Sequence, residues 1–326
     1  MFARSLLLAP RNVVLERIRY SAIEGVRTID ARLPFSKFFS HEHASLQESL
    51  ERGAVLHFPH MGFDLLPQEA RFLSPQWSNG KSKNINLRSP ADAVRGASGD
   101  EPDLALVKQM LIRYGLFAEE AIRSLFPTYM PYCIRGGTSY RPCKITAERS
   151  SWRKDDTRLH VDAFPSNPNH GLRLLRVFTN VNPDGMARVW RTGEPFKQFA
   201  ANFFSKTRRP VPGSAWLLHK LGITKSRRSA YDHLMLQLHD QVKADSTYQR
   251  TAPQQEFSFL PGATWIVFTD QVLHAAMSGQ FAFEQTFYLD PQGLSNRGEC
   301  PLDILEAFAR RPLISSSLVR AKPYRS

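Results

Sequence analysis

The sequence predicts an α+β protein whose core is mostly β-structure. From residue 138 onward, short segments rich in β-branched and aromatic residues alternate with turn residues, without regular helices between them. Such strands pair antiparallel, because parallel pairing needs long crossover connections. The earlier part of the chain has helical periodicity instead, which predicts helices around the sheets. We therefore expect an antiparallel jelly-roll barrel, a double-stranded β-helix, with flanking helices and a basic insertion.

The length of 326 residues and the hydrophobic fraction of 42% allow a single elaborated domain with a sizeable core. We expect a helical and strand scaffold over 1–137 and the jelly-roll core over 138–292, interrupted by the basic insertion at about 195–255. A C-terminal helix and a basic tail follow over 293–326. No apolar run reaches the roughly 18 residues that a membrane-spanning helix needs.

The scaffold is expected to contain four elements. In order, these are a helix over 43–53 ended by Gly53, a buried strand over 54–58, an exposed loop over 77–99 and helical structure over 101–126. Leucine, valine and tyrosine recur at three- and four-residue spacing in the last element, which is typical of one buried helix face. Pro102 suits its first turn, and Gly115 predicts a break.

The core is expected to contain strands at 171–183, 187–193, 262–270, 271–279 and 281–289. An Asn-Pro pair ends the first of these segments, and Pro-Asp-Gly precedes the second. Both are strong turn signals. This spacing of short strands is what favours the jelly roll over an α/β sheet.

A further short segment, LHVDAF, carries His160 and Asp162. Residues i and i+2 of an extended chain point to the same side, so the imidazole and the carboxylate converge. Two histidines and one carboxylate form the facial ligand set of non-haem iron oxygenases, and His274 is the natural third ligand because a closing strand can return beside His160. A buried structural histidine beside a solvent-facing Asp162 is the alternative interpretation. A second cluster at His41 and His43 is disfavoured, since no carboxylate strand accompanies it.

Three protein ligands leave iron with open positions for a 2-oxo acid such as 2-oxoglutarate and for O2. The far carboxylate of that cosubstrate suits an arginine fork. Many such oxygenases carry this arginine shortly after the second histidine, but position 284 is Glu. Arg173 and Arg176 are therefore the candidates; they lie on opposite faces of one strand, and we favour Arg176.

The formal net charge of +13 is unevenly placed. Eight Lys or Arg and no Asp or Glu occur over 195–231, interleaved with Phe203, Phe204, Trp216 and several leucines. The cations of this segment either solubilise an exposed insertion or contact an anionic membrane surface. Its apolar residues are expected either to form a local core together or to touch the headgroup region beside the cations. No nucleic-acid-binding motif accompanies the charge, so nucleic acid is not an expected partner. The three cysteines, Cys133, Cys143 and Cys300, form no disulfide framework, which favours the cytoplasm.

Three stretches carry a family resemblance: 139–190, which contains DDTRLHVDAFPS, together with GKSKNINL at 80–87 and FPHMGF at 58–63. They resemble the bacterial Kdo (3-deoxy-D-manno-oct-2-ulosonic acid) 3-hydroxylases. The resemblance implies a dioxygenase that uses Fe(II), 2-oxoglutarate and O2 to convert Kdo into its C3-hydroxylated form, Ko. It also implies that His160, Asp162 and His274 are the metal ligands.

The implied substrate is Kdo-bearing lipid A or its precursor, which carries carboxylate and phosphate groups. Arg149, Arg153, Lys154 and Arg158 are candidate contacts for the sugar acid, and ion pairs with Asp155 and Asp156 are the alternative. A cytoplasmic enzyme, peripheral on the cytosolic face of the inner membrane, fits that substrate. The open alternatives are a 2-oxoglutarate oxygenase acting on a protein or small metabolite, and a non-catalytic jelly roll that binds anionic carbohydrate or lipid.

Overall fold

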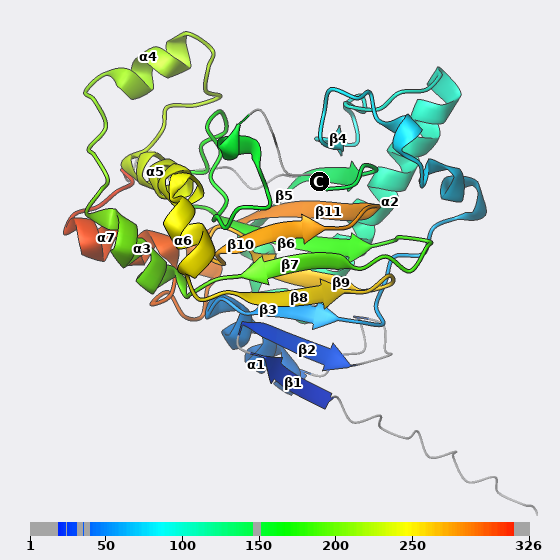
Figure 1. Ribbon diagram of the computed structural model, residues 1–326, viewed down its shortest axis with the longest axis horizontal. Helices are drawn as coiled ribbons and strands as arrows, with labels where there is room; N and C mark the ends of the chain where they lie inside the picture. The colour runs from blue at the N-terminus through cyan, green and yellow to red at the C-terminus, as the bar shows by residue number, and fades with distance from the viewer. Residues whose placement is uncertain (1–18, 24, 31–34, 36–39, 146–150, 316–326) are drawn as a thin grey trace, which may run out of the picture.

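The computed structural model describes residues 19–23, 25–30, 35, 40–145 and 151–315, and its core is two β-sheets (Figure 1). The large sheet has the strand order β1-β2-β3-β9-β6-β11-β5-β4, and the small sheet has the order β10-β7-β8. The large sheet comprises β1 (Arg19–Ile23), β2 (Val26–Asp30), β3 (Val55–Phe58), β4 (Ile85–Leu87), β5 (Cys133–Arg141), β6 (Arg173–Asn180), β9 (Thr264–Phe268) and β11 (Ala282–Leu289). The small sheet comprises β7 (Arg188–Thr192), β8 (Gln255–Phe259) and β10 (His274–Ser278). The predicted β core with flanking helices is confirmed.

Strand pairing is antiparallel through the centre of the large sheet. Val177 of β6 lies opposite Ile266 of β9 on one side and opposite Gln285 of β11 on the other. One pair departs from this pattern, because β2 and β3 run parallel. No ladder joins the edges of the two sheets within the described residues, so the jelly roll is an open pair of sheets. The expectation of a closed barrel is therefore wrong, since separate ladders hold each sheet.

Alternate residues of β6 face different layers of the molecule. Phe178 points into the space between the sheets, where its ring stacks on Trp265 with centroids 5.2 Å apart. Trp190 and Phe259 of the small sheet complete this buried aromatic layer. Val177 points to the other side, into the apolar core shared with α1 (Ser40–Glu51) and α2 (Glu101–Leu125). Figure 1 shows both helices away from the small sheet.

The helix α2 runs unbroken through Gly115, so the predicted break there is wrong. Asp100 caps the helix, its side chain accepting a hydrogen bond from the backbone amide of Asp103 at 2.9 Å. A Cβ at position 115 would collide with the guanidinium of Arg135. The glycine therefore permits a close approach of β5 to the helix. The preceding segment, expected to be an exposed loop, also contributes β4, whose Ile85 and Leu87 are buried.

The basic insertion folds largely as helices. These are α3 (Phe196–Phe204), α4 (Ser214–Lys220), α5 (Ala230–Ala244) and α6 (Ser246–Thr251). Phe203 is buried in the core, whereas Trp216 and Leu217 of α4 are about half exposed. The apolar residues expected to act together thus divide between a core helix and a protruding one. No helix of the described ranges is long and apolar enough to cross a membrane.

The expected C-terminal helix is present as α7 (Pro301–Ala309). Its buried face, including Leu302 and Leu305, joins the core. The last part of the basic tail, 316–326, and the first eighteen residues lie outside the described residues. The three cysteines, all in the described ranges, are free thiols.

Candidate metal centre and ligand cavity

Backbone pairing brings His160 and His274 together from distant parts of the chain. The amide of each donates to the carbonyl of the other at 2.9 Å, an isolated antiparallel bridge. The chain around His160 is extended but forms no regular strand beyond this bridge. The amide of Asp162 then donates to the carbonyl of Thr269 at 2.8 Å. Because His160 and Asp162 are separated by one residue, their side chains project to the same side.

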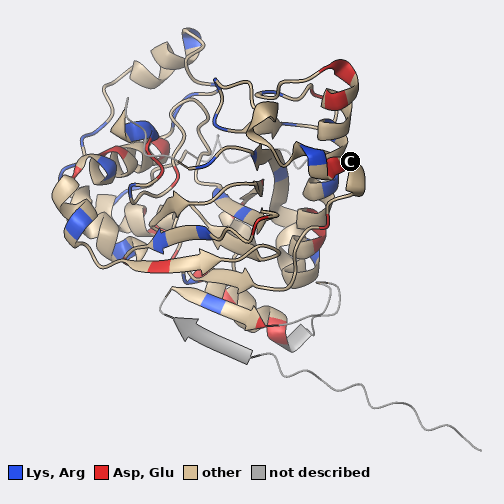
Figure 2. Cartoon of the chain, turned by 45° about the vertical axis from the view of Figure 1, so that its right-hand side comes forward, with Lys and Arg blue, Asp and Glu red and all other residues tan. Residues whose placement is uncertain are grey.

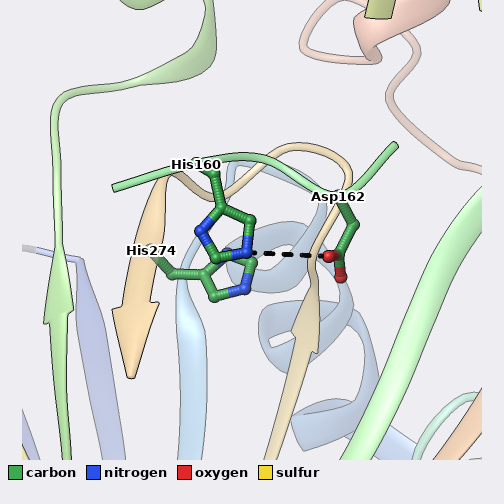
Figure 3. A group of neighbouring side chains, drawn as sticks. All are labelled: His160, Asp162 and His274. Atoms are coloured by element: carbon green, nitrogen blue, oxygen red, sulfur yellow. Dashed lines mark ion pairs between the residues drawn. The ribbon is translucent and has the colours of Figure 1, made fainter. Parts of the chain in front are cut away.

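The three side chains converge on one point (Figure 3). One donor atom from each of His160, Asp162 and His274 lies within 4.8 Å of the other two. Nε2 of His160 lies 3.9 Å from Oδ1 of Asp162. These separations are short enough for one ion to contact all three donors.

Both imidazoles are oriented by backbone carbonyls. Nδ1 of His160 lies 2.7 Å from the carbonyl oxygen of Arg158, and Nδ1 of His274 lies 2.8 Å from that of Val272. A carbonyl only accepts, so each Nδ1 carries the proton and each Nε2 keeps a free lone pair. The indole of Trp190 stacks on His274 with centroids 5.0 Å apart and further fixes that ring.

The protonation states also suit a metal. Burial is the largest cause that holds the pKa of His160 well below its ordinary value, and the electrostatic effect of the adjacent His274 is the next largest. Burial also lowers the pKa of His274. Burial opposes ionisation of Asp162, but Arg176 and the two imidazoles hold the pKa of that carboxyl well below its ordinary value. Near neutral pH the cluster therefore offers two neutral imidazoles and one carboxylate, the donor set of a non-haem iron site.

The cluster opens into a cavity of about 300 Å³ between the sheets. This volume is at the lower end of small-molecule sites. Besides the three residues of the cluster, the lining comprises Asn84, Asn86, Ser139, Arg141, Asp156, Phe164, Arg176, Phe178, Arg188, Trp190, Ala276 and Glu284. A larger groove of about 1250 Å³ near α1 is lined by none of the three residues of the cluster.

Two of the three cavity arginines share one carboxylate. Oε1 of Glu284 lies 2.9 Å from Nη1 of Arg176, and its Oε2 accepts from Nη2 of Arg141 at 2.7 Å. Burial favours neutral Glu284, but these two arginines hold the pKa of its carboxyl below the ordinary value. Arg176 also approaches Oδ2 of Asp162 at 3.3 Å. Arg176 thus connects the metal cluster with the polar wall.

Arg188 is the cavity cation without a counter-ion. Among the residues that the structure describes, no carboxylate lies within ion-pair distance of its guanidinium, and its buried Nη1 has no hydrogen-bond partner. Burial and the neighbouring positive charge of Arg141 lower the pKa of Arg188 to about 9. The group stays charged at neutral pH, so an entering carboxylate would relieve an uncompensated buried cation.

A family model described as 3-deoxy-D-manno-oct-2-ulosonic acid (Kdo) hydroxylase matches residues 36–312. This chain belongs to the Kdo hydroxylase family. A crystal structure of the Kdo hydroxylase KdoO, a non-haem Fe(II) α-ketoglutarate (2-oxoglutarate) dependent dioxygenase, in complex with cobalt(II) is similar, with a TM-score of 0.86 and 43% identity over 93% of this chain and 100% of that one. The KdoO complex with α-ketoglutarate and Fe(III) has 42% identity, the same TM-score and the same coverage. No curated protein sequence matches this chain.

The two arginines expected to bind the cosubstrate point in opposite directions in this family member. Arg176 lines the cavity, whereas Arg173 lies on the other face of β6 and is fully buried. Its Nε donates to Asp270 at 2.7 Å and its Nη2 to Gln271 at 2.7 Å. Strand parity is the reason, as expected. Arg173 therefore lies away from the cavity, in a buried ion pair with Asp270, and the geometry does not favour it as a cosubstrate contact.

Arg173 and Asp270 form a buried ion pair, so replacing Asp270 with asparagine leaves the buried charge of Arg173 without a counter-ion. We expect the free energy of unfolding to fall by about 3–5 kcal/mol, measured by urea denaturation. The matched control is Asp303→Asn, which breaks the more exposed pair with Arg297 and should cost below about 1 kcal/mol. If the free energy of unfolding falls equally in the two variants, burial does not increase the cost of breaking the Arg173–Asp270 pair.

Of the expected sugar-acid contacts, the three that the structure describes, Arg153, Lys154 and Arg158, do not line the cavity. Arg149 lies outside the described residues. Arg153 donates to Asp240 at 3.1 Å, and Arg158 pairs with Asp155 and donates to the carbonyl of Lys243. Lys154 is exposed. For Arg158 the alternative of an ion pair with Asp155 therefore describes the structure better.

Sequence reasoning missed Arg141, Arg188 and Trp190. Arg188 and Trp190 are separated by one residue in the alternating segment RVWRT, so they share a face of β7. An arginine on the same strand face as a buried tryptophan was the available signal. Arg141 ends β5 and had no comparable signal, because only the pairing of β5 with β11 places it beside Glu284.

Proposed function

We propose that this protein hydroxylates Kdo at C3, using Fe(II), 2-oxoglutarate and O2. The observation that carries the proposal is a cluster of two histidines and one aspartate that opens into a cavity with an unpaired buried arginine. The family and the likeness to KdoO support the substrate class. In the overall reaction one oxygen atom of O2 enters the sugar and the other enters succinate, while CO2 leaves.

His160, Asp162 and His274 would hold the iron. When bound, Fe(II) supplies the redox chemistry that couples decarboxylation of the 2-oxo acid to oxidation of the sugar. The carbonyls of Arg158 and Val272 keep both imidazoles in the metal-binding tautomer. Arg176 restrains the outer oxygen of Asp162. The protein thus positions the ligand atoms before iron arrives.

For the far carboxylate of 2-oxoglutarate we propose Arg188, supported by Arg141 and Arg176. Glu284 pairs with both Arg141 and Arg176, although each of them keeps a buried Nε without a partner. Arg188 has a buried Nη1 without a partner and, among the described residues, no carboxylate within ion-pair distance. Its strand neighbour Trp190 lines the same cavity and covers one side of His274. The cosubstrate would therefore bind between the metal and the small sheet.

The acceptor proposed for this site is Kdo-bearing lipid A or its precursor. We further propose that the enzyme meets it as a peripheral protein on the cytosolic face of the inner membrane. The segment 195–231, which contains no Asp or Glu, supports this, because Trp216 and Leu217 of α4 are exposed. Figure 2 shows the lysines and arginines of the chain in blue. Co-sedimentation with anionic but not with neutral vesicles is the expected result, and equal binding to both would contradict it.

The function is tested by incubating the protein with Fe(II), 2-oxoglutarate, ascorbate and Kdo-bearing lipid A. We expect mass spectrometry of the released sugar to show one added oxygen on Kdo, located at C3. A matched incubation without 2-oxoglutarate should leave Kdo unchanged. Succinate formed with an unrelated protein or metabolite, but never with a Kdo acceptor, would show that the substrate assignment is wrong.

A further inference from the structure

Three cations from two separate segments lie near residues that line the cavity. Arg88 and Arg95 belong to the segment that carries β4, and Lys225 belongs to the excursion that carries α4. All three side chains are exposed. In Figure 1 and Figure 2 these two segments stand on the same side of the sheets.

Contacts with cavity-lining residues fix the positions of the two arginines. Asn86 lines the cavity, and its backbone forms two hydrogen bonds with Arg95, at 2.8 and 2.9 Å. Arg88 directly follows β4 and comes two residues after Asn86, so its Cα lies within about 7 Å of that of Asn86. Gly96 permits the tight turn, since a Cβ there would collide with the carbonyl of Asn84.

A backbone contact fixes Lys225 near a different part of the cavity lining. Its backbone amide donates to the carbonyl of Ser166 at 3.0 Å, and Ser166 follows the cavity residue Phe164 by two positions. The pKa of Lys225 is lowered, mainly by partial burial and then by the positive charges of Arg88 and Arg95. The backbone contacts of Arg95 with Asn86 and of Lys225 with Ser166 place both segments next to the cavity lining, and the charges of the two arginines reach Lys225.

The cluster has no internal counter-ion. Over the described ranges, no carboxylate forms an ion pair with Arg88, Arg95 or Lys225, although lysines and arginines elsewhere in the molecule commonly do. A phosphate monoester carries close to two negative charges near neutral pH and three acceptor oxygens. Three convergent cations match that charge and donor requirement better than they match a single carboxylate.

We propose that Arg88, Arg95 and Lys225 bind a phosphate monoester of the acceptor while the sugar acid occupies the cavity. The site rests on the proposed function for the identity of that sugar, and it adds a second recognition point outside the reacting ring. An acceptor that is held at the phosphate site and in the cavity enters with one orientation. That orientation determines the sugar carbon that faces the metal. The phosphate contact contributes binding rather than chemistry, so its loss should raise KM and spare kcat.

The test uses the triple variant Arg88→Gln, Arg95→Gln and Lys225→Gln with two acceptors in detergent micelles. One is Kdo-bearing lipid A with its phosphates, and the other is the same lipid after phosphatase treatment. For the phosphorylated acceptor, we expect the triple variant to raise KM on the order of tenfold, because three exposed charge contacts are lost together. The kcat and the KM for 2-oxoglutarate should not change. Arg123→Gln, an exposed change on α2, is the control and should behave as wild type.

Removing the acceptor's phosphates should raise the wild-type KM by the same factor and abolish the difference between wild type and variant. A difference that persists on the dephosphorylated acceptor would overturn the assignment, and so would an unchanged KM on the phosphorylated one. Binding to the two kinds of micelle is measured in parallel without 2-oxoglutarate. Wild-type binding that ignores the phosphates overturns this proposal alone, whereas absence of Kdo hydroxylation overturns the proposed function alone.

Discussion

Replacing His274 with alanine is expected to abolish metal binding and turnover together. The imidazole of His274 supplies one of the three donor atoms. His160 and Asp162 alone cannot complete a facial site. Isothermal titration with Co(II) or Fe(II) should show a loss of affinity of at least about 100-fold, and succinate formation should fall to background. The backbone bridge to His160 does not depend on the side chain, so the fold should persist.

A matched histidine separates this effect from a general loss of imidazole. His233 lies on α5, and within the described part of the chain its ring forms one hydrogen-bond contact, with the carbonyl of Arg208. His233→Ala should retain metal affinity and activity, and circular dichroism should show both variants folded. Metal affinity at the wild-type level in folded His274→Ala would remove His274 from the ligand set.

Replacing Arg188 with glutamine is expected to weaken 2-oxoglutarate binding by about 100-fold while sparing the metal. The reason is that a buried, uncompensated guanidinium forms its main ion pair only with the ligand, and such pairs are worth about 2–5 kcal/mol. Titration of 2-oxoglutarate into the Co(II)-loaded protein measures the effect without turnover. The Co(II) affinity itself should not change.

Arg191 provides the control on the same strand. It lies on the opposite face of β7 from Arg188, is partly exposed and approaches Glu256 at 3.6 Å. Arg191→Gln should bind 2-oxoglutarate as the wild type does. If Arg188→Gln also binds the cosubstrate normally, the far carboxylate is held elsewhere in the cavity, and Arg141 becomes the candidate.

Local patterns predicted much of the fold. The strands β6, β7, β9, β10 and β11 all lie within the segments predicted from alternating residues and turn signals. Closure of the sheets could not be predicted, because it depends on pairing between strand edges that are distant in the sequence. Gly115 was misjudged for a related reason: its close neighbour Arg135 comes from another element.

The residues of the site also fall into two groups: some could be predicted from local spacing, and others meet only through the pairing of distant strands. The spacing of His160 and Asp162 was readable because both side chains leave one short extended segment, and strand parity correctly separated Arg176 from Arg173. Arg141 and Glu284 meet only through the register of β5 and β11. Interactions that depend on register between distant strands therefore stayed hidden, and they form the polar wall of the cavity.

The most direct test of the proposed function is isotopic. Kdo-bearing lipid A is incubated with the Fe(II)-loaded protein, 2-oxoglutarate and ¹⁸O2, and the sugar and succinate are analysed together. The proposed reaction predicts one ¹⁸O at C3 of Kdo and one in succinate, with the two products formed in equal amounts. Succinate formed at the same rate with and without the Kdo acceptor, and a sugar that gains no ¹⁸O, would contradict it.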